Sequence, residues 1–354
     1  MVMIDVHAHL FFDELMGEAG TYGPAIQTGP SGHRLVTGGM EWPVSDPSLL
    51  AASPASRLDA LDDAGIEMQV VSISPLWLFH HAPPEVAERF AGLANNLLSS
   101  WCSRTDGRGL GLAQLPTQRP EAAAEELHRC VKDLGMVGGY MGSDARPHLD
   151  NEALDPVYQA CQDLDVPLFV HSAMPGIDGP PGDPRLDRWT GQAVIGYPLE
   201  DTIAASSFLL GSVLDRFPRL DVCLSHAGGG LAMLWGRLSA FARTARSPVT
   251  EARLNEHLQR LWFDVHVHSD EADALVRRTL PTDHLVFGSN FGGWDSERPP
   301  NHLDPALTSN ARRLLRLDRA AGATPPASSS AKHRPPHPMS VQSLPIITTQ
   351  EVEP

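Results

Sequence analysis

Positive charge is scarce in this sequence, which carries 27 lysine and arginine residues against 43 aspartate and glutamate residues and a formal net charge of -16. A surface that binds nucleic acid or an anionic membrane needs clustered basic side chains. We therefore expect no nucleic acid and no membrane partner. A local site can still be positive on an acidic protein, so an anionic small molecule remains compatible with this composition.

Cysteines and long apolar runs are also scarce. The four cysteines form no Cys-x-x-Cys pair, and we interpret them as reduced thiols of a cytoplasmic protein. No apolar run reaches the roughly 20 residues of a membrane-spanning helix, and no basic and apolar leader precedes the first strand. We expect a cytoplasmic protein whose 42% hydrophobic residues suffice for a large core.

Strand-like and helix-like segments alternate along most of the chain. The strand-like segments are residues 2–10, 68–74, 110–116, 137–142, 166–171, 221–226, 261–268 and 284–290. Eight alternations predict an α/β fold of the (β/α)8 TIM-like barrel type. An open doubly wound sheet is the alternative, which we disfavour because no Gly-x-Gly-x-x-Gly motif follows the first strand.

Two segments lack this alternation. Residues 11–56 form a long loop insertion after the first strand, rich in glycine, proline and serine, and we expect it to be irregular and either functional or disordered. Residues 323–354 are rich in proline and serine, which predicts a disordered tail. The predicted barrel domain is therefore residues 1–322. His333 and His337 lie in the tail, and we do not take them as metal ligands.

The first strand ends in His7-Ala8-His9. Residues two apart in a strand point the same way, so both imidazoles face one spot. Two neutral imidazoles that converge suit a divalent transition metal such as zinc, which needs further ligands from elsewhere in the chain.

Polar residues at other strand ends supply candidates for those ligands, because the active site of such a barrel lies at the C-terminal ends of its strands. The candidates are His7, His9, His171, His226, His266, His268 and Asn290. Together they predict a metal centre. The pair His266 and His268 has the same spacing as the first pair. We favour the first pair because it directly follows a buried apolar run, and we interpret the second as rim or outer residues.

Four motifs carry a resemblance to a known family. They are residues 4–9 (Ile-Asp-Val-His-Ala-His), 168–171 (Leu-Phe-Val-His), 222–230 (Val-Cys-Leu-Ser-His-Ala-Gly-Gly-Gly) and 286–291 (Val-Phe-Gly-Ser-Asn-Phe). The chain resembles the aminocarboxymuconate semialdehyde decarboxylase family, a branch of the amidohydrolase superfamily, from Met3 to about Leu317. The resemblance implies a metal-dependent non-oxidative decarboxylase of an unsaturated or aromatic carboxylic acid. It also implies a homodimer.

The resemblance implies roles for individual residues. The metal-binding histidines of the family match His7, His9 and His171, and the histidine that acts as acid and base matches His226. An arginine that holds a substrate carboxylate matches Arg34, for which the alternative is a solvated loop cation. The implied cofactor is a divalent metal, zinc in the first place, with manganese and iron as alternatives.

Asn290 departs from the family pattern, which places a metal-bound aspartate there. An amide oxygen can bind a divalent metal, but it carries no charge and cannot act as a base near neutral pH. We keep Asn290 as a metal ligand and catalytic-site residue and do not assume that Asp295 replaces it. The missing carboxylate weakens the main alternative, a metal-dependent hydrolase. A third alternative is a barrel that only binds a ligand.

A second departure lies near Gln192 and Ala193, where an aromatic residue of the family is missing. The substrate pocket is then reshaped relative to the family. We name Trp189 and Trp294 as the aromatic residues that compensate for this loss.

Overall fold

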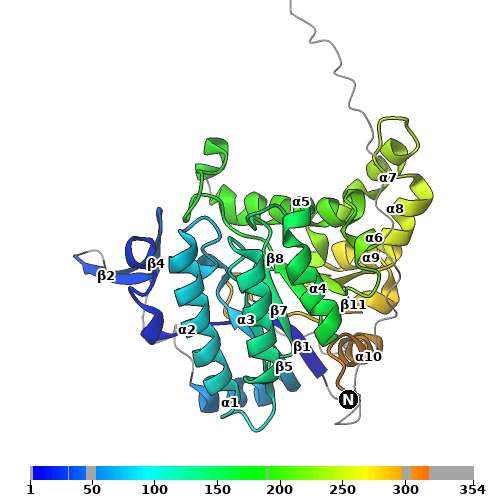
Figure 1. Ribbon diagram of the computed structural model, residues 1–354. Helices are drawn as coiled ribbons and strands as arrows, with labels where there is room; N and C mark the ends of the chain where they lie inside the picture. The colour runs from blue at the N-terminus through cyan, green and yellow to red at the C-terminus, as the bar shows by residue number, and fades with distance from the viewer. Residues whose placement is uncertain (1–2, 31, 45–52, 189, 297–303, 319–354) are drawn as a thin grey trace, which may run out of the picture.

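The computed structural model describes residues 3–30, 32–44, 53–188, 190–296 and 304–318, and its centre is a parallel β-barrel (Figure 1). The eight strands neighbour one another in chain order: β1 (Met3–Leu10), β5 (Ile66–Ile73), β6 (Gly109–Gln114), β7 (Gly138–Gly142), β8 (Leu168–His171), β9 (Val222–Leu224), β10 (Leu261–Asp264) and β11 (Leu285–Val286). Hydrogen bonds from Val6 N to Phe287 O (2.9 Å) and from His9 N to Phe291 O (2.7 Å) join the last segment to β1. The predicted (β/α)8 barrel is confirmed.

Helices connect the strands and cover the outside of the barrel (Figure 1). They are α1 (Pro54–Ala64), α2 (Pro84–Cys102), α3 (Pro120–Lys132), α4 (Asp155–Leu164), α5 (Tyr197–Leu210), α6 (Val213–Arg216), α7 (Leu231–Ala242), α8 (Glu251–Leu258), α9 (Asp270–Thr279) and α10 (Pro305–Leu314). A proline stands in the first turn of several of them, where its missing N–H costs no hydrogen bond. Among the described residues, no helix is long and apolar enough to cross a bilayer.

The barrel interior is packed with side chains from alternate strand positions. Ile4, Leu112, Phe169 and Trp262 come from four different strands and belong to one buried cluster. Leu314 of α10, a helix that the sequence pattern did not predict, joins the same cluster. The interior is therefore a solid core, as is usual for this architecture, and polar chemistry is left to the strand ends.

Much of the described part of the long segment after β1 is regular, so the prediction of an irregular loop is wrong there. Strands β2 (Ala25–Gly29), β3 (Gly32–Thr37) and β4 (Met40–Val44) form an antiparallel sheet at one side of the barrel (Figure 1). Its β3–β4 hairpin is anchored where Gly39 N donates to Ile177 O at 2.9 Å. Gly38 has φ of 52°, and a Cβ there would lie 1.5 Å from the same carbonyl, so only glycine permits this approach.

The predicted disordered tail, with His333 and His337, lies outside the described residues. The domain boundary at residue 322 remains a prediction.

A buried chain of hydrogen bonds ties α1 to the barrel. Arg57 donates from Nη1 to Gln69 Oε1 (2.8 Å) and from Nη2 to His9 O (3.1 Å). Gln69 Nε2 in turn donates to Asp5 Oδ2 at 2.7 Å, and the Arg57 guanidinium lies 4.0 Å from the centroid of the Phe291 ring. The chain fixes the backbone of β1 at the point where its two histidines stand.

We predict that Arg57→Met lowers the free energy of unfolding by about 2–4 kcal/mol, because the buried acceptors Gln69 Oε1 and His9 O lose their donor. Urea unfolding measures the change. The matched control is Arg89→Met, which removes an exposed ion pair with Glu18 and should cost less than about 1 kcal/mol. Equal losses in the two variants would contradict the prediction.

Candidate metal centre

Three imidazole rings converge at the C-terminal end of the barrel. His7 and His9 stand on β1, and His171 ends β8. The Nε2 atom of His7 lies 3.1 Å from that of His9 and 3.0 Å from that of His171. All three side chains are buried. The structure thus brings together the three histidines that were predicted to bind a metal.

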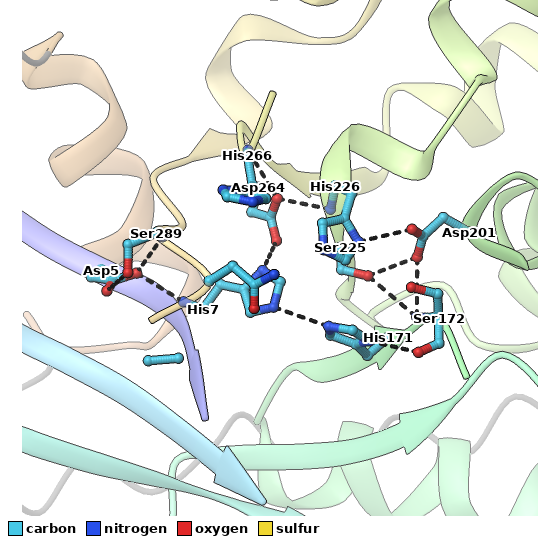
Figure 2. Close-up of polar contacts among 12 residues, drawn as sticks. Asp5, His7, His171, Ser172, Asp201, Ser225, His226, Asp264, His266 and Ser289 are labelled. Carbon is cyan, nitrogen blue, oxygen red and sulfur yellow. Dashed lines mark hydrogen bonds and ion pairs between the residues drawn. The ribbon is translucent and has the colours of Figure 1, made fainter. Parts of the chain in front are cut away.

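The Nδ1 atom of each ring makes a hydrogen bond on the side away from this centre. The partners are Asp264 Oδ2 for His7 (2.7 Å), Ser72 Oγ for His9 (3.0 Å) and Ser172 O for His171 (2.7 Å). A carboxylate and a carbonyl can only accept, so we assign the hydrogen of His7 and of His171 to Nδ1. Their Nε2 lone pairs then face the common centre (Figure 2).

This donor set fits a divalent metal. Burial, with the neighbouring imidazoles, lowers the pKa of His7 and of His9 well below its usual value. Burial likewise lowers the pKa of His171 to about 4. Neutral rings whose lone pairs face each other across about 3 Å repel unless a cation lies between them, and a tetrahedral zinc site spaces its ligands by roughly 3.4 Å. A histidine that binds a metal through one ring nitrogen usually makes a hydrogen bond through the other, which fixes the orientation of the ring.

His226 follows β9 and faces the same centre. Its Nδ1 donates to Asp201 Oδ2 at 2.8 Å, and it offers a nitrogen within 4.8 Å of ligand atoms of His7 and His171. Burial lowers the pKa of this ring, but the Asp201 carboxylate, together with those of Asp264 and Asp295, outweighs burial and raises the pKa of His226 to about 9. This ring therefore carries a proton at neutral pH, unlike the other three.

Asn290 follows β11 with φ of 50°. Its Nδ2 donates to Asp295 Oδ1 at 2.7 Å, whereas its Oδ1 is buried without a hydrogen-bond partner. The carboxylate of Asp295 can only accept, which fixes the amide orientation and leaves Oδ1 available as a ligand. A Cβ on Gly293 would lie 2.4 Å from that oxygen, so a glycine is needed beside it.

Two of the three predicted substrate-binding residues, Arg34 and Trp294, lie among the described residues. Arg34 lies on β3, and its half-exposed guanidinium pairs with Glu41 at 2.8 Å. The Trp294 side chain is exposed, and Trp189 lies outside the described residues. The roles of these residues in substrate binding remain predictions.

The carboxylates behind the histidines were missed by sequence reasoning. Asp264, the last residue of β10, accepts from His7 Nδ1 with Oδ2 and from the main-chain N–H groups of His226 (2.8 Å) and His266 (3.1 Å) with Oδ1. Asp201 on α5 holds the His226 ring (Figure 2). An acidic residue at a strand end, two residues before a histidine, is the signal that could have found Asp264. Nothing in the sequence around Asp201 points to its partner.

Asp5 supports the centre from the other side. It accepts hydrogen bonds from His7 N (3.1 Å), Ser289 N (3.0 Å) and Ser289 Oγ (2.6 Å) (Figure 2). These contacts lock the strand that carries His7 to the segment that carries Asn290. The signal for Asp5 was its position as a charged residue in a buried strand, two residues before the first of the two histidines.

The second histidine pair lies beyond the end of β10, so the predicted strand 261–268 is too long at its C-terminus. The His266 ring is buried, with its centroid 6.1 Å from that of His7, whereas about half of the His268 side chain is exposed. His268 is thus a rim residue, and His266 lies inside.

Comparison with known proteins places these features in a family. An amidohydrolase family model matches residues 4–317. The chain is 28% identical over 283 residues to 2-amino-3-carboxymuconate-6-semialdehyde decarboxylase from Dictyostelium discoideum, with 75% of this chain and 77% of the relative covered. It is 32% identical over 307 residues to gamma-resorcylate decarboxylase from Polaromonas sp. strain JS666, with 79% and 92% covered.

A solved structure shares the fold. Dihydroxybenzoic acid decarboxylase from Polaromonas sp. JS666, with bound manganese and the inhibitor 2-nitroresorcinol, matches with a TM-score of 0.71 and 21% identity over 90% of this chain and 98% of that chain.

We predict that Asp264→Asn weakens binding of a divalent metal by about 10–100-fold. The amide Nδ2 would face His7 Nδ1–H and drive the ring to the tautomer whose Nε2 carries the hydrogen. Competition with a chromophoric chelator measures the affinity. The matched control is Asp215→Asn, which alters a histidine–carboxylate contact with His257 outside the centre and should leave metal affinity unchanged. An unchanged affinity in Asp264→Asn would contradict the prediction.

Proposed function

The chain belongs to the amidohydrolase family, and we propose that within this family it is a metal-dependent non-oxidative decarboxylase of an aromatic or unsaturated carboxylic acid. The observation that carries the proposal is the convergence of three imidazoles at one strand-end centre beside a fourth, His226, whose Nδ1 is held by the Asp201 carboxylate. Relatives named as decarboxylases support the proposal independently of this geometry.

We propose that His7, His9, His171 and the Oδ1 of Asn290 hold a divalent metal. Zinc suits three imidazoles and an oxygen, and manganese, which the Polaromonas structure contains, and iron are alternatives. A cation held there would supply positive charge that polarises a substrate oxygen and fixes the substrate carboxylate.

His226 is the proposed proton donor. When the bond to the carboxylate breaks, its electron pair stays on the substrate carbon, and that carbon must receive a proton as carbon dioxide leaves. The free nitrogen of His226 faces the centre because its other nitrogen is held by Asp201 at 2.8 Å. Asp201 stabilises the imidazolium before transfer and orients the ring during it. Asn290 carries no charge, which favours this chemistry over a hydrolase that needs a carboxylate base at that position.

Arg34 remains the proposed partner of the substrate carboxylate, and Trp294 and Trp189 the proposed lining of the substrate pocket.

We also propose a homodimer, which the family resemblance implies. Exposed apolar side chains on neighbouring parts of the surface support it: Val194, Ile195, Leu199, Ile203, Met233, Leu234 and Phe241. A monomer in light scattering would contradict the proposed homodimer.

A cytoplasmic location is likewise a proposal, supported by four unpaired cysteines.

The metal-loaded protein is expected to release carbon dioxide from hydroxybenzoate or muconate-type acids, beginning with gamma-resorcylate. We predict that His226→Gln lowers kcat by about 10²–10⁴-fold, because the proton donor is lost, while the metal held by His7, His9 and His171 is retained. A carbon dioxide assay and metal analysis measure the two effects. Absence of release from every such acid by the metal-loaded protein would refute the proposed function.

We predict that Asn290→Asp alone lowers kcat/KM by about tenfold or more, because it sets a second carboxylate at hydrogen-bond distance from Asp295. The double variant Asn290→Asp/Asp295→Asn should recover most of the loss, since it restores a donor and an acceptor and keeps the net charge. Steady-state kinetics on the two single variants and the double variant form a double-mutant cycle. Higher activity in Asn290→Asp alone would mean that the amide is not native to the mechanism.

A further inference from the structure

A second cluster of ligand atoms lies directly beside the metal centre. His226, His266 and Asp295 each offer one nitrogen or oxygen atom, and these atoms all lie within 4.8 Å of one another. The rings of His226 and His266 are 5.5 Å apart between centroids, and Asp295 Oδ2 lies 3.5 Å from His266 Nε2. The three residues come from the segments that follow β9, β10 and β11.

The burial of the His266 ring, without a hydrogen bond to either of its nitrogens in the described part of the chain, is the observation that points to a bound ligand. Only 1% of its side chain is exposed, and neither of its ring nitrogens has a hydrogen-bond partner among the described residues. A buried polar group left unpaired costs about 1–3 kcal/mol, so such groups in native proteins usually have a partner. Asp295 Oδ2 lies 3.5 Å from Nε2 of this ring. This is too long for a good hydrogen bond, but it matches the roughly 3.4 Å between two ligands of one tetrahedral cation.

We propose that His226, His266 and Asp295 form a second divalent-cation site, separate from the one held by His7, His9 and His171. Because Nδ1 of His226 is bound to Asp201, only its Nε2 can bind a cation. The cation displaces the proton that this nitrogen carries, and one nitrogen binds one cation. The three remaining histidines are enough for the first ion, so assigning His226 to the second set leaves both sets intact.

The second site is the weaker of the two. It offers only three protein ligands, and its ion repels the ion in the first site. The carboxylate of Asp295 lies inside the set, and those of Asp201 and Asp264 touch neighbouring histidines. This negative charge reduces the repulsion and makes double occupancy feasible at raised metal concentration. Imidazole nitrogens with one carboxylate suit zinc and, less strongly, manganese.

Occupancy of the second site has a functional consequence, which rests on the proposed function. An ion on His226 Nε2 takes the place of the proton that this ring would deliver to the substrate carbon. The second ion is therefore an inhibitor: activity should rise as the first site fills and fall as the second fills.

The decisive experiment is metal stoichiometry of the full-length protein. Metal-stripped protein is dialysed against increasing zinc, and the bound metal is measured by plasma mass spectrometry. We expect the parent chain to bind about one more ion per chain than His266→Gln and Asp295→Asn. The matched control is His268→Gln, which removes the exposed ring 3.2 Å from the same carboxylate and should bind as many ions as the parent. His333 and His337 are present in all four proteins, so tail binding cancels in the difference.

Equal stoichiometry in the parent and His266→Gln would overturn the proposal. So would loss of an ion in His268→Gln but not in His266→Gln, because the ion would then sit at the exposed rim. Retention of the tight first ion shows that each variant is folded. In the activity assay, excess zinc should inhibit the parent at least tenfold more strongly than His266→Gln. If no carbon dioxide release is found at all, the proposed function fails, while the stoichiometry still decides the second site.

Discussion

The carboxylate of Asp264 is the contact on which the arrangement of the centre depends. One of its oxygens accepts from the His7 ring, and the other accepts from the backbone of both His226 and His266. A single side chain at the end of β10 therefore sets the tautomer of a histidine on β1 and positions the segments that follow β9 and β10. Its partner His7 lies 257 residues away in the sequence, and barrel closure is what brings the two together.

A buried chain of hydrogen bonds on the opposite side of β1 keeps the facing imidazoles in place. Rings whose lone pairs meet at 3.0–3.1 Å repel one another without a cation, so the backbone that carries them must resist relaxation. Arg57, Gln69 and Asp5 form a buried chain of hydrogen bonds that ends on the backbone of His7 and of Ser289. Such preorganisation costs stability at the site, and buried contacts of this kind, together with core packing, offset it.

The candidate metal ligands could be predicted from the sequence, but most of the residues that hold them in place could not. The two-residue period of a strand was enough to place His7 and His9 on one face, and the rule that barrel sites lie at strand ends added His171, His226 and Asn290. Asp201 sits on α5 and reaches His226 only through the packing of that helix on the barrel, which no local pattern records. The sheet of β2, β3 and β4 was missed because its strands are short and separated by glycine-containing turns, so their alternation is weak.

The position of negative charge distinguishes this centre from the family pattern that the sequence resembles. An amide stands at residue 290, and the nearest carboxylate is that of Asp295, which binds the amide through Oδ1 and points Oδ2 at His266 and His268. The carboxylate nearest to residue 290 in the chain thus faces His266 and His268. The proposed first ligand set of His7, His9, His171 and Asn290 is neutral, whereas the Asp295 carboxylate and the buried His266 ring belong to the proposed second set. Asn290 and His266, whose ring nitrogens make no hydrogen bond among the described residues, thus both face the carboxylate of Asp295, and His226 stands between the two proposed ligand sets.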